Sequence, residues 1–536
     1  MFAPAPASTG TWQLVRFNLR KDRIKIPAWT LGISVFMLYY ATALPEVFPD
    51  QASLQSMAQF MTGPIGAVMG GPGYGADSLT LERLIVGVYG LYFLLAVALM
   101  NILLISRHTR ADEEAGRTEL IRANVVGRHA TLNAALLTAV IANVLLTVLF
   151  TAAMLSADYP AGDSLLFAAG LGALGLAFAG LSALTAQISE YSRAGSGMAG
   201  AALGVAYVVR AIGDMLEPQG SLLSWLSPIA WSQQTRAFVD GRWWPLALSV
   251  SFAAVTAVVA YRLSARRDVG HGLVAARPGP AEAAPRLRSP LALSLRLQRA
   301  NILGWGIAVT LGGLSFGGTV DAMDSSFAGV SEELLAIMGG ADQITDGYLG
   351  LMGFVMALVV SIYGILSVHR LWSEEVGGRL EPVLATATSR WAVMGSHLVV
   401  TAGSAVGLLV LAGFGTGLGA AAVTGEGAHV WELTVAHVAH APGVLVVIGA
   451  ATLLFGVLPR AVNIVWIVPI YAMLVGFFGP MLDLPEWMPN LSPLNHIAQL
   501  PLEDFTLAPV LILMGIAAAT VVVGLPAFRR RDLATN

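Results

Sequence analysis

Uncharged, apolar stretches long enough to cross a lipid bilayer dominate this chain. Two examples are IPAWTLGISVFMLYYATAL at residues 26–44 and LIVGVYGLYFLLAVALMNILLI at residues 84–105. A helix needs about 18 to 20 such residues to span the hydrocarbon core. Only 12% of the residues are charged, against about 25% in a typical soluble domain. The sequence therefore predicts an all-α integral membrane protein.

Twelve stretches have the length and hydrophobicity of a membrane span. Their approximate bounds are residues 27–44, 84–106, 131–155, 164–186, 197–216, 245–262, 302–320, 348–368, 392–415, 433–457, 462–480 and 507–528. All lysine and arginine residues lie on the side of the N-terminus except Arg83, Arg210, Arg236 and Arg242. Because basic residues favour the inner side of a membrane, we expect a bacterial inner-membrane protein with both termini in the cytoplasm.

The segment before the first span is amphipathic. Residues 11–25 read TWQLVRFNLRKDRIK. Helical spacing would place Trp12, Val15 and Leu19 on one face, and Arg16, Arg20 and Arg23 on another. This pattern predicts a helix that lies on the inner leaflet. The alternative is a basic flank that only sets the orientation of the first span.

The chain contains an internal duplication. LRKDRIKIPAWTLG at residue 19 matches LRLQRANILGWGIA at residue 295 without gaps, AVMGG (67–71) recurs as AIMGG (336–340), and LSPIAWSQQ (226–234) as LSPLNHIAQ (491–499). The matches follow the same order in both halves, as in repeat proteins. We predict two tandem six-span units, residues 1–268 and 293–536, related by a pseudo-two-fold axis along the membrane normal. Residues 269–292, which are rich in Pro, Gly, Ala and Arg, would be a cytoplasmic linker.

A charged segment also occurs twice, between the second and third spans of each half. Residues 113–128 read EEAGRTELIRANVVGR and residues 374–390 read EEVGGRLEPVLATATSR. The pattern predicts a short helix after a glycine hinge, with acids near its start and Arg at its end. The matched residues are Glu113, Glu114, Gly116, Arg117, Glu119 and Arg128, and Glu374, Glu375, Gly377, Arg379, Glu381 and Arg390, with Gly378 as an extra residue. The alternative to a functional role is a solvated loop. Because two copies of the segment are expected in the cytoplasm, we favour docking sites for two copies of a soluble partner.

These two segments resemble the coupling-helix region of type-2 ABC exporter permeases. That family has six spans per unit, an inner-leaflet amphipathic helix before the first span, and short re-entrant outer helices between spans five and six. Residues 221–238 and 484–501 of this chain are the counterparts of the re-entrant helices. The fused double form looks like the permeases of polyketide-antibiotic exporters, including the tetronasin-resistance type.

The resemblance implies two copies of a soluble ABC ATPase, one beneath each coupling helix, with ATP and Mg bound by those subunits. The chain itself would bind no cofactor and would not be an enzyme. A P-loop needs a lysine, and the only lysines, Lys21 and Lys25, do not follow a glycine-rich loop. We expect Glu114 and Glu375 to lie on the surface and to contact the ATPase.

The expected cargo is an apolar or amphiphilic, drug-like compound, because the central spans carry few charges and the outer loops are rich in acids. Membrane lipid is the other expected partner, and nucleic acid is not expected. A secondary transporter of the major-facilitator type also has twelve spans, but its Gly-x-x-x-Asp-Arg-x-Gly-Arg-Arg pattern is replaced here by RHTRADEEAGRTEL at residues 107–120. A membrane enzyme or assembly scaffold ranks third, because no catalytic residues can be assigned.

Several other polar residues lie in predicted spans. Arg210 and Asp214 are spaced i, i+4 near the outer end of the fifth span, as a pathway pair or a structural pair, and Arg210 could reach the interface. His429, His437 and His440 have the spacing of a helical face, but no carboxylate is fixed beside them and cysteine is absent, so we assign no metal site. Asn101, Asn143 and Asn463 are expected to join helices by hydrogen bonds.

Overall fold

The computed structural model describes residues 7–48, 50–268, 270–274, 281–282, 284–320, 344–478, 485 and 487–533. These residues form helices and connections, and no strand occurs among them. Within the same ranges, 12 helices are long and apolar enough to cross a membrane. The prediction of a twelve-span, all-helical membrane protein is therefore confirmed. The AIMGG repeat at residues 336–340 lies outside the described residues.

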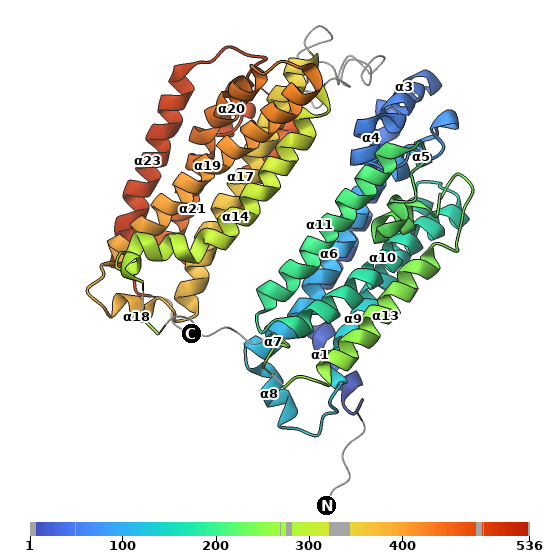
Figure 1. Cartoon of the computed structure of the whole chain (residues 1–536), viewed down its shortest axis with the longest axis horizontal. Coiled ribbons are helices and arrows are strands. Elements are labelled where there is room, and N and C mark those ends of the chain that lie inside the picture. Colours follow the sequence, from blue (N-terminus) through green and yellow to red (C-terminus); the bar gives the residue numbers. More distant parts are fainter. Residues whose placement is uncertain are drawn as a thin grey trace, which may run out of the picture. The chain divides into compact units, whose positions relative to one another are not determined.

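The first compact unit is Met1–Gly279. Its helices are α1 (Thr11–Lys21), α2 (Lys25–Val47), α3 (Gln51–Thr62), α4 (Pro64–Met69), η1 (Ala76–Ser78), α5 (Leu81–Leu84), η2 (Ile85–Tyr89), α6 (Gly90–His108), α7 (Arg110–Glu114), α8 (Arg117–Arg122), α9 (Ala130–Leu155), α10 (Ala161–Ile188), α11 (Ser192–Leu216), η3 (Ser224–Leu226), α12 (Pro228–Gln233) and α13 (Leu246–Ser264). The long helices run side by side, with α7 and α8 at one end and α3 and α4 at the other (Figure 1). Helix α10 is central and packs against α6, α9, α11 and α13.

The second compact unit is Pro280–Asn536. Its helices are η4 (Pro285–Leu287), α14 (Pro290–Gly317), α17 (Ile344–Val376), α18 (Glu381–Leu384), α19 (Arg390–Thr424), α20 (His429–Ala439), α21 (Ala441–Val457), η7 (Pro459–Trp466), α22 (Ile467–Phe478), η8 (Pro489–Leu491) and α23 (Leu507–Arg530). Both units pair their spans in the same way. The first span packs against the third (α2 with α9, α14 with α19), and the fourth against the sixth (α10 with α13, α21 with α23).

The segment before the first span differs between the units. In the first unit α1 is a separate helix that ends at Lys21, so the predicted helix before the first span is present. Its Val15 is buried and packs toward α9, whereas Trp12 is 54% exposed. In the second unit α14 runs from Pro290 into the span without a break. The structural repeat is therefore looser here than the ungapped sequence match indicates.

Buried amides join two spans of the first unit. Asn101 Nδ2 donates to Asn143 Oδ1 at 3.1 Å, and Asn143 Nδ2 donates to Asn101 Oδ1 at 2.7 Å. Beside them a Cβ at Gly175 would lie 2.0 Å from Asn143 Oδ1, so glycine permits this close packing of α10. The predicted role of these two amides is confirmed, whereas Asn463 is exposed on η7 and does not fit it.

The two expected re-entrant segments also differ. Residues 221–238 form η3 and α12, whose Ser224, Ile229 and Ser232 are buried. In residues 484–501 the described part contains only the short helix η8 and turns. A helical pair is thus present in the first unit, and the described residues of the second unit do not repeat it.

Candidate functional site

The predicted coupling region of the first unit is a helical loop between α6 and α9. We call residues 112–128 the first charged segment. Asp112 lies on α7 and joins Lys21 at the end of α1 (2.7 Å) to Arg117 at the start of α8 (2.8 Å). Between α7 and α8, Gly116 has φ +71°, a left-handed conformation that glycine adopts without strain. The predicted hinge and short helix are both present.

The second unit has the same construction. We call residues 374–390 the second charged segment. Helix α17 continues through Val376, Gly378 has φ +67°, and the one-turn helix α18 follows. Glu374 accepts a hydrogen bond from Arg379 Nε at 2.5 Å, as Asp112 does from Arg117 Nε at 2.9 Å.

These glycines correct the sequence alignment of the two copies. Gly378 has the same backbone conformation as Gly116, and each is followed by the Arg that closes the hinge. Gly378 is therefore the counterpart of Gly116 and not an extra residue. The repeat is ungapped, so Asp112 corresponds to Glu374, and Glu113 to Glu375.

In each unit the charged segment is tied to the end of the last span. Arg267, which follows α13, donates to both carboxylate oxygens of Glu113 at 2.7 and 2.9 Å. Arg531, which follows α23, donates to both oxygens of Glu375 at 2.5 and 2.7 Å. Glu113 also accepts from Arg110 at 2.7 Å. Two-pronged Arg–carboxylate pairs are among the stronger side-chain interactions.

A second tie to the last span is also present in both units. Arg128, near the start of α9, donates to the carbonyl of Ala265 at 2.5 Å. Arg390, the first residue of α19, donates to the carbonyls of Arg529 at 3.3 Å and Arg531 at 2.5 Å. The same end of the last helix thus contacts both ends of each charged segment.

The predicted contact residues differ in exposure. Glu375 is 2% exposed, so the expectation that it lies on the surface is wrong. Glu114 is exposed, and it accepts from Ser192 N (3.1 Å) and Ser192 Oγ (2.5 Å) at the start of α11. There it satisfies a free backbone N–H and complements the helix dipole. Glu119 and Glu381 are exposed.

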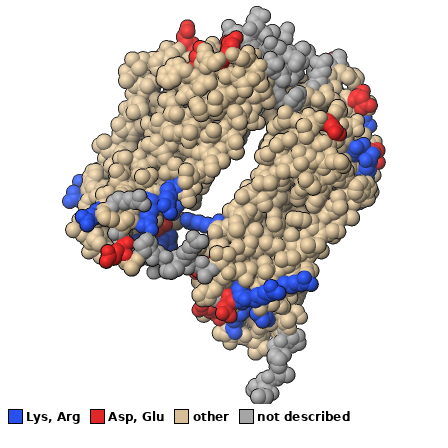
Figure 2. Space-filling view, viewed as in Figure 1, with Lys and Arg blue, Asp and Glu red and all other residues tan. Residues whose placement is uncertain are grey.

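The tips of the two segments present different side chains to solvent. On the first charged segment Leu120 is 73% and Val125 78% exposed. The residues at the corresponding positions of the second charged segment, Pro382 and Ala387, are also exposed but smaller. Figure 2 shows Lys and Arg gathered at one end of each unit. Each charged segment therefore presents exposed side chains at one end of its unit.

An ionic cluster lies beside the first charged segment. Asp22, just after α1, is 2.6 Å from His108 Nε2 and 3.1 Å from Arg107 Nε. Burial opposes its ionisation, but the hydrogen bond with His108 and the nearby positive charges outweigh burial. The pKa of Asp22 is therefore lowered from its ordinary value. In the ungapped repeat Gln298 occupies the corresponding position of the second unit.

Arg210 and Asp214 form a fully buried pair at the other end of the first unit. Arg210 donates to Asp214 at 3.3 Å and to the carbonyl of Ala67, at the end of α4, at 2.9 Å. Asp214 also accepts from Ser224 Oγ at 2.6 Å. Because Arg210 is 0% exposed, the suggestion that it reaches the interface is wrong. The contacts support the structural interpretation: Arg210 holds the AVMGG segment.

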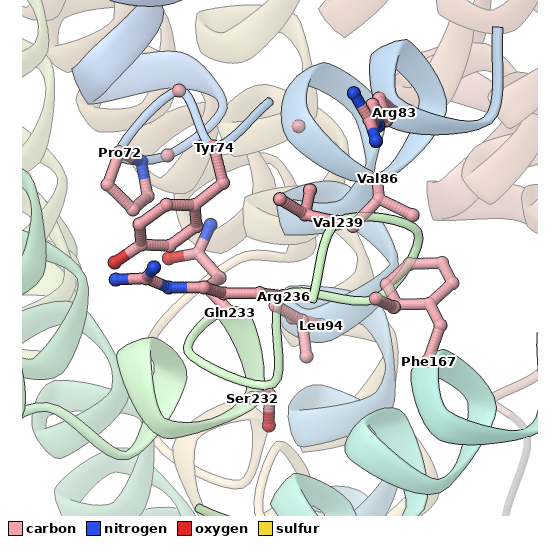
Figure 3. Close-up of a pocket in the computed structure, with 14 residues that line it drawn as sticks. Pro72, Tyr74, Arg83, Val86, Leu94, Phe167, Ser232, Gln233, Arg236 and Val239 are labelled. Carbon is pink, nitrogen blue, oxygen red and sulfur yellow. The ribbon is translucent and has the colours of Figure 1, made fainter. Parts of the chain in front are cut away.

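A narrow pocket lies next to that segment (Figure 3). Gln233 Nε2 donates to the carbonyl of Gly70 at 2.6 Å, and Arg236 stacks on Tyr74 with its guanidinium carbon 4.2 Å from the ring centroid. A Cβ at Gly71 would lie 2.5 Å from Gln233 Nε2, so only glycine fits there without movement. The sequence indicated no contact of Gln233 or Arg236 with this segment, although both lie in the expected re-entrant segment 221–238 and Gln233 also lies in the LSPIAWSQQ repeat.

Two of the three candidate histidines are buried. His437 Nδ1 lies 2.8 Å from the carbonyl of Leu433, and His440 is 1% exposed at the break between α20 and α21. His429 lies within 3.6 Å of the exposed Glu426 and Glu432. Across the described ranges no group of three His, Asp or Glu side chains is arranged to hold a metal ion.

Comparison with known proteins gives the family. The family described as "Multidrug efflux system permease Rv1217c, C-terminal domain" matches residues 14–262 and 287–529. The chain is also 36% identical, over 533 residues, to the multidrug efflux system permease protein Rv1217c of Mycobacterium tuberculosis, covering 98% of this chain and 95% of that protein. This chain belongs to the Rv1217c family of efflux permeases.

The family match relates directly to the fold. Each matched stretch lies within one compact unit and contains one charged segment, whereas Arg267, Ala265 and Arg531, which tie the segments to the last spans, lie just beyond the matched stretches. As a member of the Rv1217c family this chain is a multi-pass membrane permease, in agreement with its twelve apolar helices.

Proposed function

We propose that this chain is the membrane subunit of an ATP-driven exporter of the type-2 ABC class. Two copies of a soluble ABC ATPase would bind it, one at each charged segment. The observation that carries the proposal is the duplicated charged segment: each copy is a short, protruding helix after a left-handed glycine, between the second and third spans of its unit. The printed name of the Rv1217c relative, a permease of an efflux system, supports a complex of several components.

The exposed residues of the two segments would make the contact. On the first charged segment these are Glu119, Leu120 and Val125, and on the second Glu381 and Pro382. Glu113 and Glu375 are held within the chain, so they would shape the docking surface without touching the partner. ATP and Mg would be bound by the ATPase subunits, since neither Lys21 nor Lys25 follows a glycine-rich loop.

The cargo would be an apolar or amphiphilic, drug-like compound moved outward across the bacterial inner membrane. The relative's name specifies multidrug efflux, and most described spans carry few charges. The excess of basic residues on the side of the charged segments supports cytoplasmic termini.

The test uses the full chain purified with a lone ABC ATPase from the same organism. Native mass spectrometry should give one copy of this chain and two ATPase copies, and reconstituted vesicles should export a lipophilic dye only when ATP is supplied. Export that follows a proton gradient without ATP would instead indicate a secondary transporter. A complex with one ATPase copy would contradict the two-site arrangement.

A further inference from the structure

The ties between the charged segments and the last spans form a repeated unit of structure. We call the pairs Glu113–Arg267 and Arg128–Ala265 the first clasp, and Glu375–Arg531 and Arg390–Arg529 the second clasp. Each clasp joins the connection between spans two and three to the end of span six. Helices that are far apart in sequence are thereby linked at one point.

The Arg–Glu pair of each clasp is shielded from solvent, whereas the hydrogen bonds of Arg128 with Ala265 and of Arg390 with Arg529 are exposed. The side chains of Arg267 and Glu113 are 8% and 11% exposed, and those of Arg531 and Glu375 are 14% and 1% exposed. Exposed ion pairs contribute little because water screens them. Pairs held at this level of burial, with two hydrogen bonds each, keep one geometry and are costly to break on one side.

The clasps recur although the residues around them differ. In the first unit α7 is separate from α6, whereas in the second unit α17 runs on to Val376. In the first unit Glu113 also pairs with Arg110, and Trp372 stands at the corresponding ungapped position; Arg531 of the second clasp instead stacks on Phe455 and Phe528. A contact kept through such different surroundings is one on which both units depend.

We propose that Arg267 and Arg531 are positioning residues that fasten each charged segment to the last span of its own unit. Movement of a charged segment is then carried into α13 in the first unit and α23 in the second. This inference rests on the proposed function, since the movement would begin at a bound ATPase. It adds the sixth span to the route by which ATP hydrolysis reaches the membrane domain.

The functional test replaces each arginine by glutamine. Arg267→Gln and Arg531→Gln should lower the dye exported per ATP hydrolysed by about tenfold, the effect of losing one charge-assisted hydrogen-bonded pair, while the ATPase still binds. Arg266→Gln and Arg530→Gln are matched controls, because these neighbours are exposed and carry the same charge. Arg531→Lys, which keeps the charge but loses the two-pronged geometry, should give an intermediate ratio.

A second measurement needs no ATPase. The chain has no cysteine, so spin labels can be placed on Leu120→Cys in α8 and Arg262→Cys in α13, both exposed. In the full chain in lipid, the label-to-label distance distribution should be narrow. Arg267→Gln should broaden it at least about twofold, and Arg266→Gln should leave it unchanged.

The outcomes separate this inference from the proposed function. A distance distribution that stays narrow in Arg267→Gln would overturn the clasp, whatever the energy source for export. A normal export ratio in both arginine variants would overturn its role in transmission. If the distance distribution broadens but export proves independent of ATP, the clasp is supported as a structural contact. The proposed function is then contradicted, and so is the role of the clasp in transmission, which depends on it.

Discussion

The two six-span units of this permease share their helix pairing but differ at both ends. At the end with the charged segments, the first unit has a separate α1 and the ionic cluster around Asp22, whereas the second has a continuous α14 and Gln298. At the opposite end the first unit holds its AVMGG segment with buried Arg210, and the described helix α22 of the second carries no charge. Among the described residues, the hinge glycines, the hinge salt bridges and the clasps are the same in both units.

This difference indicates which features follow from duplication and which from later divergence of each unit. Many different combinations of side chains can maintain the same pairing of helices in a bilayer, because apolar residues of similar size can replace one another. A two-pronged ion pair has no such substitutes. The repeated clasps are therefore the more specific mark of a shared mechanism, and the following predictions test the comparison.

The largest effect is expected at the end of the first unit where the charge of Arg210 is buried. Arg210→Ala removes the positive charge beside Asp214 and the donor to Asp214 Oδ2 and to the carbonyl of Ala67 in a fully buried site. Loss of one partner of a buried pair costs about 3–5 kcal/mol. Thermal unfolding of the purified chain in detergent should show a much lower midpoint. A midpoint within error of the parent would mean that the pair is dispensable.

The next effect contrasts Glu114 and Glu375, the two acidic residues for which the sequence predicted a surface position. Glu375→Lys places a positive charge against Arg531 in a site that is 2% exposed, and should destabilise the chain by about 2–3 kcal/mol. Glu114→Lys removes only an exposed cap on α11 and should cost about 1 kcal/mol. Urea or thermal titration of both variants measures the difference. Equal losses of stability would show that burial of the carboxylate does not determine the cost of these substitutions.

A smaller effect should separate the two docking tips. Leu120→Asp removes a large exposed apolar side chain, whereas Pro382→Asp removes a smaller one. If these tips contact the ATPase, Leu120→Asp should weaken binding by about 1–3 kcal/mol, and Pro382→Asp by less. Titration of labelled ATPase onto the permease in nanodiscs gives both affinities. A larger effect at Pro382 would reverse the proposed order of the two sites.

The smallest effect concerns pH. Because the pKa of Asp22 is lowered in the folded chain, its ionised form stabilises the fold above the unfolded pKa of about 4. This stabilisation is lost as the pH falls from the unfolded pKa to the lower pKa that Asp22 has in the folded chain. Asp22→Asn should therefore lower stability at pH 6 and reduce its decline between about pH 5 and pH 3. Gln298→Ala, at the matching position, should leave that decline unchanged.

Much of the fold was predictable because its signals are local. Twelve apolar stretches became twelve candidate spans, and the hinge glycines began the two short helices where the charge pattern placed them. The Asn101–Asn143 bridge also followed from polar residues in apolar helices. The sites were less predictable, because the residues that pair are far apart in the sequence. Glu113 and Arg267 are separated by 154 residues, and Glu375 and Arg531 by 156 residues. No periodic pattern connects residues at such separations.

By itself the sequence determined the membrane class, the number of spans, the duplication and the position of both charged segments. These properties depend on hydrophobic length, residue order and glycine placement, which can be read along the chain. Only the tertiary structure decided the register of the repeat and the burial of Glu375 and Arg210. Backbone conformation at one glycine set the register, and the partners of each charge were chosen when helices distant in sequence packed together. A charge costs little in water and much inside a protein unless it is paired, so its role depends on where folding places it.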